Sequence, residues 1–234
     1  MSRAILLPVY NEASTLGFVL DSVRRQFSGE ILVVDDGSTD DTGEVLAARA
    51  DVTVISNSVN AGYGAALSVG FTFASRRGVS ELITMDCDGQ HEPAHIPDFF
   101  SLLSQGADII SGSRYLPESR EIGRAPASRS EINVRVTREV NRVTGWSLTD
   151  SFCGFKAYRL AAISGFVWKE TGYGFPLEVW AKAYNRGLIV VESPVERIYH
   201  DYNRSFGPAL DDPEVRFEYY MRVWRSALAE GGGV

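Results

Sequence analysis

Short apolar runs recur along the first half of the chain at intervals of about 25 residues, and most lead through polar residues into segments with helical spacing. These runs are Ala4 to Pro8, Ile31 to Val34, Val52 to Ile55, Leu82 to Met85 and Ala107 to Ser111. A continuous β-branched run is typical of a strand that is buried on both faces of a parallel sheet. The alternation therefore predicts an α/β fold with a mostly parallel sheet and helices on both faces.

Local signals set the expected element boundaries. Pro8 is expected to end the first strand, because proline cannot donate a hydrogen bond within a ladder. The second helix is expected to be capped by Thr39 or Asp40 and to run to Ala50. A last helix is expected from about Pro213 to Ala229.

Asp86 and Asp88 stand one residue apart at the end of the fourth run. In an extended segment, side chains two apart share a side, so both carboxylates face the same way and Cys87 turns inward. Two carboxylates about 4 Å apart repel by roughly 4 kcal/mol at an effective dielectric constant near 20. Oxygen-only ligands favour Mg²⁺ or Mn²⁺ as the group that offsets this repulsion. Taken alone, the triplet is equally compatible with a solvated turn after a strand.

Polar clusters follow several of the expected strands, where parallel sheets bind ligands. They are Tyr10-Asn11-Glu12, Asp35-Asp36, Asp86-Cys87-Asp88 and Ser113-Arg114. Gly62 and Gly64 at a helix entrance would let backbone N–H groups approach an anion, although ordinary turn chemistry is the favoured explanation when these two glycines are taken alone. Together, the clusters predict a binding site along one rim of the sheet.

The segment from Tyr115 to Ser130 is a long loop that contains Arg120, Arg124 and Arg129. Long ordered loops in compact domains are usually functional, and arginine suits bidentate contact with phosphate. The alternative is a solvated basic surface.

Composition excludes some classes of protein. Lys plus Arg number 23 against 30 Asp plus Glu, a net charge of −7, which argues against bulk nucleic-acid binding. The two cysteines do not indicate a disulfide framework, and no apolar run approaches the roughly 20 residues of a membrane span. We expect a cytoplasmic protein without a signal peptide, and a peripheral contact with the cytoplasmic face of the membrane is left open.

The motifs, taken in order, resemble the GT-A glycosyltransferases of family 2, over roughly residues 3 to 200. The resemblance rests on Pro8-Val9-Tyr10-Asn11-Glu12, Val33 to Asp40, Asn60 to Gly64 and Met85 to His91. Within the family, Gln90-His91-x-Pro93, Gly112 to Tyr115 and Asp150-x-x-x-Gly154-Phe155 are similar to the dolichol-phosphate mannose synthase branch.

The resemblance implies one GT-A domain over residues 1–212, with a nucleotide-binding half at about 1–114, an acceptor half at about 115–212, and a C-terminal helix and tail at 213–234. Residues implied on the donor side are Pro8, Tyr10, Glu12, Asp35, Asp36, Gly62 and Asp86. Asp35 would accept from the base and Asp36 would brace the turn. Mg²⁺ or Mn²⁺ would be held by Asp88, with Asp86 and Gln90.

On the acceptor side, the resemblance implies that Arg114 and Arg124 contact phosphates and that Asp150 lies near the acceptor. The branch usually carries a late Arg-x-x-Gly-x-Ser pattern, whereas this chain has His200 to Ser205 in the matching stretch. Either Arg204 replaces the missing arginine or the acceptor end differs.

The implied activity is a metal-dependent, inverting transfer of a hexose from a GDP- or UDP-sugar to an acceptor, with a polyprenyl (dolichyl) phosphate as one candidate. An anionic lipid phosphate needs no strong general base, whereas a hydroxyl acceptor would need a carboxylate such as Asp150 or Glu178. The alternatives are a sugar nucleotidyltransferase, whose usual glycine- and lysine/arginine-rich phosphate loop is missing near the first strand, and a non-catalytic nucleotide-sugar-binding module.

Overall fold

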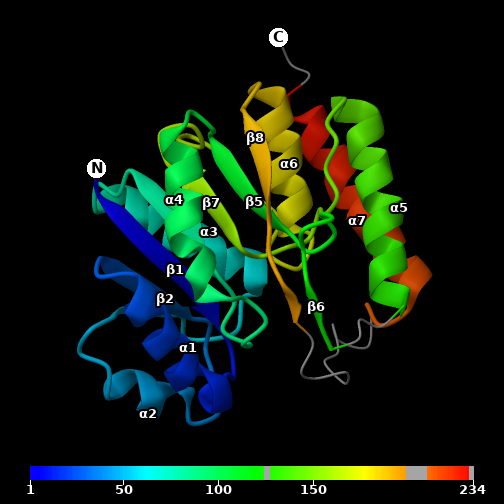
Figure 1. The fold of residues 1–234 in the computed structure, drawn as a ribbon. Helices are drawn as coiled ribbons and strands as arrows, with labels where there is room; N and C mark the ends of the chain where they lie inside the picture. Colours follow the sequence, from blue (N-terminus) through cyan, green and yellow to red (C-terminus); the bar gives the residue numbers. More distant parts are fainter. Residues whose placement is uncertain (124–126, 199–209, 232–234) are drawn as a thin grey trace.

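The computed structural model describes residues 1–123, 127–198 and 210–231. Within these residues the main sheet has seven strands in the order β3-β2-β1-β4-β7-β5-β8 (Figure 1). The strands are β1 (Arg3–Val9), β2 (Glu30–Asp35), β3 (Thr53–Ser56), β4 (Glu81–Thr84), β5 (Ile109–Ser113), β7 (Lys156–Arg159) and β8 (Val190–Pro194). A separate two-stranded sheet joins β6 (Glu121–Ile122) to β9 (Arg197–Ile198).

All pairings in the main sheet are parallel except those of β7, which runs antiparallel to both β4 and β5. This insertion brings the segment before β7 beside the end of β4. The expectation of a mostly parallel α/β sheet is confirmed.

Helices cover both faces of the sheet (Figure 1). They are α1 (Ala13–Gln26), α2 (Thr42–Ala47), α3 (Tyr63–Arg76), α4 (Ile96–Ser104), α5 (Ala127–Thr144), α6 (Phe175–Asn185) and α7 (Pro213–Ala229), with a 3₁₀ turn at Pro93–His95. Successive residues of β1 enter opposite cores: Leu6 packs in the core under α3, α5, α6 and α7, and Ile5 and Leu7 in the core under α1 and α4.

Pro8 does not end the first strand, because β1 continues to Val9. Leu6 faces β4, since its carbonyl accepts from Met85 N at 3.0 Å. By the two-residue alternation, Pro8 faces the same side, where β4 has already ended at Thr84. The missing N–H of Pro8 therefore costs no ladder hydrogen bond.

The second helix is shorter than expected, spanning Thr42–Ala47 with Asp41 at its N-cap position. The Asp40 carboxylate instead accepts from the backbone N–H groups of Ala13 and Thr42, and so ties the start of α1 to the start of α2.

The last helix, α7, forms at the expected residues and packs against α5 and α6. Its N-cap residue Asp212 accepts from the backbone N–H groups of Glu214 and Val215. The division of the chain at residues 114 and 212 stays a prediction.

Candidate functional site

A cavity of about 450 Å³ lies at the carboxyl ends of β1, β4 and β5, within the size range of small-molecule sites. Its lining includes Pro8, Tyr10, Glu12, Asp36, Gly62, Tyr63, Asp86, Cys87, Asp88, Gln90, Arg114, Ile132, Asn133, Phe152, Tyr173, Arg216 and Tyr220. The sequence-predicted donor and metal residues therefore meet here, with the exception of Asp35.

Asp86 is held from two sides at the end of β4. Tyr63 Oη donates to Asp86 Oδ1 at 3.1 Å, and His91 Nε2 lies 3.8 Å from Asp86 Oδ2. The Asp86 N–H donates to His91 Nδ1 at 3.1 Å, which leaves the imidazole proton on Nε2, toward the carboxylate. Burial and the Asp86 charge raise the pKa of Tyr63, so that its hydroxyl stays a donor.

Asp88 and Gln90 follow Asp86 along the same side of the cavity. The Asp88 carboxylate accepts from Gln90 N at 3.0 Å, and Cys87 between the aspartates is buried, as the alternation predicts. Two carboxylates and an amide are oxygen donors that suit Mg²⁺ or Mn²⁺.

The described part of the chain contains no group of three or more His, Cys, Asp and Glu side chains placed to hold a metal on their own. Asp86, Asp88 and Gln90 alone therefore form an incomplete set of ligands. An incomplete set fits a Mg²⁺-type ion that takes its remaining ligands from substrate phosphates and water.

The neighbouring aspartates Asp35 and Asp36 lie in different places: Asp36 lines the cavity and Asp35 does not. Asp36 is buried and accepts from Asn57 Nδ2, Ala61 N and Gly62 N at 2.7–3.1 Å, which braces the loop before α3. Asp35 accepts from Ser38 N at 3.0 Å and lines a separate shallow hollow.

Gly62 has a φ of +106°, and a Cβ atom there would lie 2.4 Å from Thr171 O. The close approach to the 171 loop explains this glycine without reference to a ligand.

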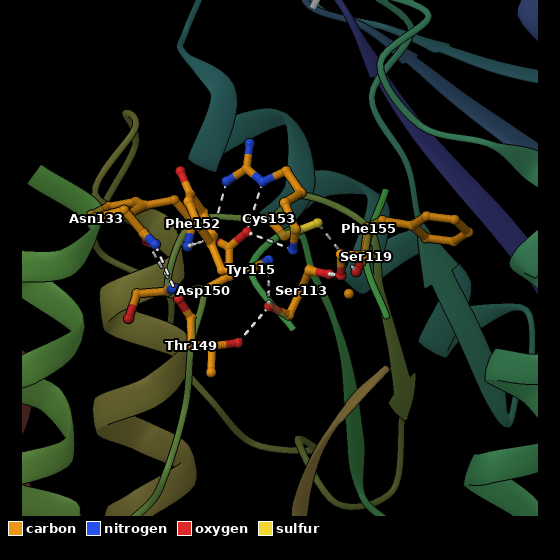
Figure 2. Close-up of polar contacts among 12 residues, drawn as sticks. Ser113, Tyr115, Ser119, Asn133, Thr149, Asp150, Phe152, Cys153 and Phe155 are labelled. Atoms are coloured by element: carbon orange, nitrogen blue, oxygen red, sulfur yellow. Dashed lines mark hydrogen bonds and ion pairs between the residues drawn. The ribbon is translucent and has the colours of Figure 1, made fainter. Parts of the chain in front are cut away.

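Arg114 forms a bidentate ion pair with Asp150, with Nε to Oδ2 at 2.7 Å and Nη2 to Oδ1 at 3.0 Å. Asp150 has no exposed surface and also accepts from Phe152 N at 3.0 Å (Figure 2). Burial by itself raises the pKa of Asp150, but Arg114 outweighs this effect and holds that pKa below its usual value of 3.8. Asp150 thus serves as an ionised partner of Arg114 beneath the cavity wall.

The backbone on either side of this ion pair is fixed by further polar contacts. The Glu192 carboxylate accepts from the backbone N–H groups of Thr149 and Asp150. Asn133 bridges Thr149 O and Ser151 N at 3.1 Å each, and Ser113 contacts Thr149 through their hydroxyls (Figure 2). Arg114 therefore projects from a rigid support.

Glu178 lies elsewhere. Its side chain is buried and accepts from Lys169 N and Glu170 N at 2.9–3.1 Å, with Lys182 Nζ at 3.4 Å. It does not belong to the described cavity lining. Arg124 and Arg204 lie outside the described residues.

Sequence reasoning missed several lining residues, above all Tyr63, Asn133, Arg216 and Tyr220. Tyr63 stands inside the glycine loop and could have been found from its position there. The α7 residues carry no sequence signal, because Arg216 and Tyr220 fit an ordinary amphipathic helix.

The comparison with protein families decides the class. A model described as "Glycosyl transferase family 2" matches residues 4–166. The chain belongs to glycosyltransferase family 2. The match favours a glycosyltransferase over a sugar nucleotidyltransferase.

Relatives place this family 2 chain in the dolichol-phosphate mannose synthase-like branch. It is 34% identical over 200 residues to the polyprenol monophosphomannose synthase of Mycolicibacterium smegmatis, covering 82% of this chain and 75% of the relative. It is 31% identical over 208 residues to the undecaprenyl-phosphate mannosyltransferase of Micrococcus luteus, covering 86% and 85%. The dolichol-phosphate mannosyltransferase of Pyrococcus furiosus is 29% identical, with 99% of this chain and 65% of the relative covered.

Solved structures confirm the GT-A fold of the family 2 chain. Glucosyl-3-phosphoglycerate synthase from Mycobacterium tuberculosis in complex with UDP superposes with a TM-score of 0.76 at 21% identity, covering 97% of this chain and 80% of that chain. The same enzyme with Mn²⁺, UDP and glucosyl-3-phosphoglycerate gives a TM-score of 0.75 at 20% identity, with the same coverage.

Within the described residues, none of the helices combines the length and the apolar character needed to cross a membrane.

Proposed function

We propose that this family 2 enzyme transfers a hexose, with inversion, from a nucleoside-diphosphate sugar to a polyprenyl phosphate. The observation that carries the proposal is that one cavity is lined both by Asp86 and Asp88 and by Arg114 and Arg216. The first pair suits a metal–diphosphate, and the second pair suits the phosphate of an acceptor. The names of the mycobacterial and micrococcal relatives, which refer to polyprenyl phosphates, support this acceptor class.

Donor binding is assigned to residues 1–114. We infer that Pro8, Tyr10 and Glu12 receive the nucleotide, with Asp35 toward the base, while Asp36 fixes Gly62 and its loop.

Asp88, Asp86 and Gln90 would hold Mg²⁺ or Mn²⁺, which neutralises the diphosphate leaving group when it is bound. The solved complex of the mycobacterial structural neighbour with Mn²⁺, UDP and glucosyl-3-phosphoglycerate supports the proposal that these residues hold a divalent metal. Tyr63 orients one oxygen of Asp86, and the Asp86 side chain is 28% exposed.

In the proposed reaction, a phosphate oxygen of the acceptor attacks the anomeric carbon of the sugar from the side opposite the diphosphate. The bond between that carbon and the diphosphate oxygen breaks, and the nucleoside diphosphate leaves with the bonding electrons. The attacking oxygen is already anionic, so no side chain needs to remove a proton. Arg114, together with Arg124, stabilises the phosphate charge in this proposal.

The ionised state of Asp150 serves this scheme, because it keeps Arg114 in place and charged. With a hydroxyl acceptor, Asp150 would have to leave its ion pair in order to act as a base. The geometry therefore favours a phosphate acceptor over a hydroxyl acceptor.

The test is release of nucleoside diphosphate from GDP-, UDP- and dTDP-hexoses with Mn²⁺, in the presence and absence of farnesyl phosphate as a short polyprenyl phosphate. We expect acceptor-dependent release and a glycosylated lipid phosphate. Asp88→Ala should lose Mn²⁺-dependent transfer, whereas Asp98→Ala, an exposed aspartate on α4, should not. Transfer by Asp88→Ala near the wild-type rate with Mn²⁺ would refute the metal site, and no transfer to farnesyl phosphate from any donor would refute the acceptor class.

A further inference from the structure

Tyr173, in the loop before α6, is a half-exposed aromatic residue of the cavity wall. It belongs to the cavity lining, and 40% of its surface is exposed. Its ring is nearly parallel to that of Tyr63, with an interplanar angle of 20° and centroids 6.1 Å apart. An aromatic surface therefore borders the space that the substrates occupy in the proposed function.

The backbone on either side of Tyr173 is fixed by hydrogen bonds. The Gly172 N–H donates to Glu170 Oε1 at 2.7 Å, and the Gly174 N–H donates to Tyr219 Oη at 3.1 Å. The Tyr219 hydroxyl in turn donates to Glu170 Oε1, so the two supports are joined to each other. Tyr173 is thus held in place before any substrate binds, which lowers the entropic cost of ordering it on binding.

The same loop packs against the start of α3. Ala65 N in the first turn of α3 donates to Thr171 O at 3.1 Å. Tyr63, the first residue of α3, donates from its hydroxyl to Asp86 Oδ1 at 3.1 Å. Tyr173 is therefore joined to the proposed metal–diphosphate position through one aromatic ring.

The donor hexose is the part of the substrates that has to lie near this position. In a nucleoside-diphosphate sugar the anomeric carbon is bonded to the outer phosphate, so a diphosphate held at Asp86 and Asp88 brings the hexose within a few bonds of the metal. The nucleoside extends the other way, toward Pro8, Tyr10 and Glu12. A hexose ring carries a face of C–H groups that packs on an aromatic ring, and aromatic side chains are common in small-molecule sites.

The isoprenoid chain of the acceptor has other apolar lining available. Ile132 of α5, Tyr220 of α7 and Phe152 all belong to the lining, and the rings of Tyr220 and Phe152 pack with centroids 4.6 Å apart. Tyr173, by its stack on Tyr63, belongs to the side of the cavity that contains Asp86. The position of its ring therefore favours the sugar over the lipid chain.

We propose that Tyr173 is the surface on which the donor hexose packs, and that its ring contributes to recognition of the sugar. This inference rests on the proposed function, because it takes the donor to be a nucleoside-diphosphate hexose. The ring holds the hexose beside the metal-bound diphosphate and adds no step to the reaction.

The experiment compares binding of a nucleoside diphosphate with binding of the same nucleotide carrying a hexose. The probes are GDP with GDP-mannose, UDP with UDP-glucose and dTDP with dTDP-glucose, titrated by calorimetry into the full chain with Mn²⁺. Tyr173→Ala removes the ring and Tyr173→Phe keeps it. Tyr184→Ala removes a tyrosine of nearly the same exposure, 39%, that lies outside the described lining, and is the matched control. The KM for farnesyl phosphate is measured on the same samples.

For the pair of probes that the wild type binds, Tyr173→Ala should raise the Kd of the hexose conjugate about tenfold. The Kd of the free nucleoside diphosphate and the KM for farnesyl phosphate should stay close to their wild-type values. Tyr173→Phe and Tyr184→Ala should bind both probes as the wild type does. Tyr173→Leu keeps apolar volume against Tyr63 without an aromatic face, should also weaken the conjugate, and replaces Tyr173→Ala if that variant does not fold.

The outcomes separate the two proposals. If the wild type binds none of the hexose conjugates and transfers no hexose, the proposed function fails and this inference fails with it. If the wild type binds a conjugate and Tyr173→Ala weakens the conjugate and the free nucleotide equally, Tyr173 supports the nucleotide and only the inference is overturned. A rise confined to the KM for farnesyl phosphate would assign the ring to the lipid chain, with the same consequence. An unchanged Kd of the conjugate in both Tyr173→Ala and Tyr173→Leu would also overturn it.

Discussion

Gly154 lies directly against the carboxylate of Asp86, so closely that a Cβ atom at residue 154 would come within 2.4 Å of Asp86 Oδ2. The contact exists because β7 is inserted antiparallel beside β4. Thr84 Oγ1 donates to Gly154 O at 2.8 Å and fixes the two segments together. A glycine from the second half of the chain thus sets the position of an aspartate from the first half.

Gly154→Ala should displace the Asp86 carboxylate, because the added Cβ would overlap it while the hydrogen bond from Thr84 holds the backbone of residue 154 against β4. A misplacement of about 1 Å at a reacting centre costs roughly a hundredfold in rate, and we expect a loss of this order in kcat/KM. The measurement is steady-state transfer with Mn²⁺. Gly17→Ala, in α1 where an added Cβ meets nothing within 4 Å, is the control and should leave the rate unchanged. A fully active Gly154→Ala enzyme would show that Asp86 does not need its observed position.

Tyr63→Phe should weaken the proposed metal site while keeping the ring, which stacks on Tyr173 with centroids 6.1 Å apart. The change removes the hydroxyl that donates to Asp86 Oδ1. We expect kcat/KM to fall about tenfold, which corresponds to about 1.4 kcal/mol, and the Mn²⁺ concentration for half-maximal activity to rise. Tyr184→Phe, a half-exposed tyrosine on α6, should have no effect. If the Mn²⁺ dependence of Tyr63→Phe equals that of the wild type, Tyr63 does not support the metal site.

The sheet rim was predictable from sequence, because hydrophobic runs define strands and the carboxyl ends of parallel strands share an edge. Asp86, Asp88 and Arg114 follow such runs directly, and the structure places them in one cavity. The burial of Cys87 followed from the same two-residue alternation.

Contacts between distant segments were not predictable, since no local pattern encodes them. Whether β1 can contain Pro8 depends on where β4 ends, because only a neighbouring strand would need the missing N–H. The need for glycine at residue 62 depends on the close approach of Thr171. The lining role of Arg216 depends on how α7 packs against α5 and α6. Helix periodicity shows which face is apolar, but not which cavity an arginine on that face reaches.

Asp150→Asn should destabilise the protein, because it leaves the Arg114 guanidinium without its buried partner. Breaking a buried ion pair typically costs about 3–5 kcal/mol of the free energy of unfolding. Glu139→Gln breaks a comparable bidentate pair with Arg142 on the exposed face of α5 and should cost no more than about 1 kcal/mol. Urea unfolding of the three proteins at neutral pH measures both differences.

The same pair predicts a pH dependence of stability. The folded-state pKa of Asp150 is lowered below 3.8, so its contribution is complete above the unfolded-state pKa and is lost as the pH falls through the folded-state value. The difference in unfolding free energy between wild type and Asp150→Asn should therefore be constant near neutral pH and shrink below about pH 3.8. A difference that does not change in this acid range would contradict an ionised Asp150.

Glu178→Gln should affect stability more than catalysis. The Glu178 carboxylate accepts three hydrogen bonds from the backbone N–H groups of Lys169 and Glu170, and this stretch leads into the cavity-lining loop at Gly172 and Tyr173. An amide in its place presents N–H groups to N–H groups, and we expect a loss of about 2 kcal/mol in unfolding free energy.

The kcat of the folded Glu178→Gln variant should stay within a few-fold of wild type. A general base, by contrast, contributes about a hundredfold or more to the rate. Thermal or urea unfolding and kcat are measured on the same samples, with Glu218→Gln on the exposed face of α7 as the control. A large fall in kcat with unchanged stability would assign Glu178 to proton transfer, and would in turn favour a hydroxyl acceptor over the lipid phosphate.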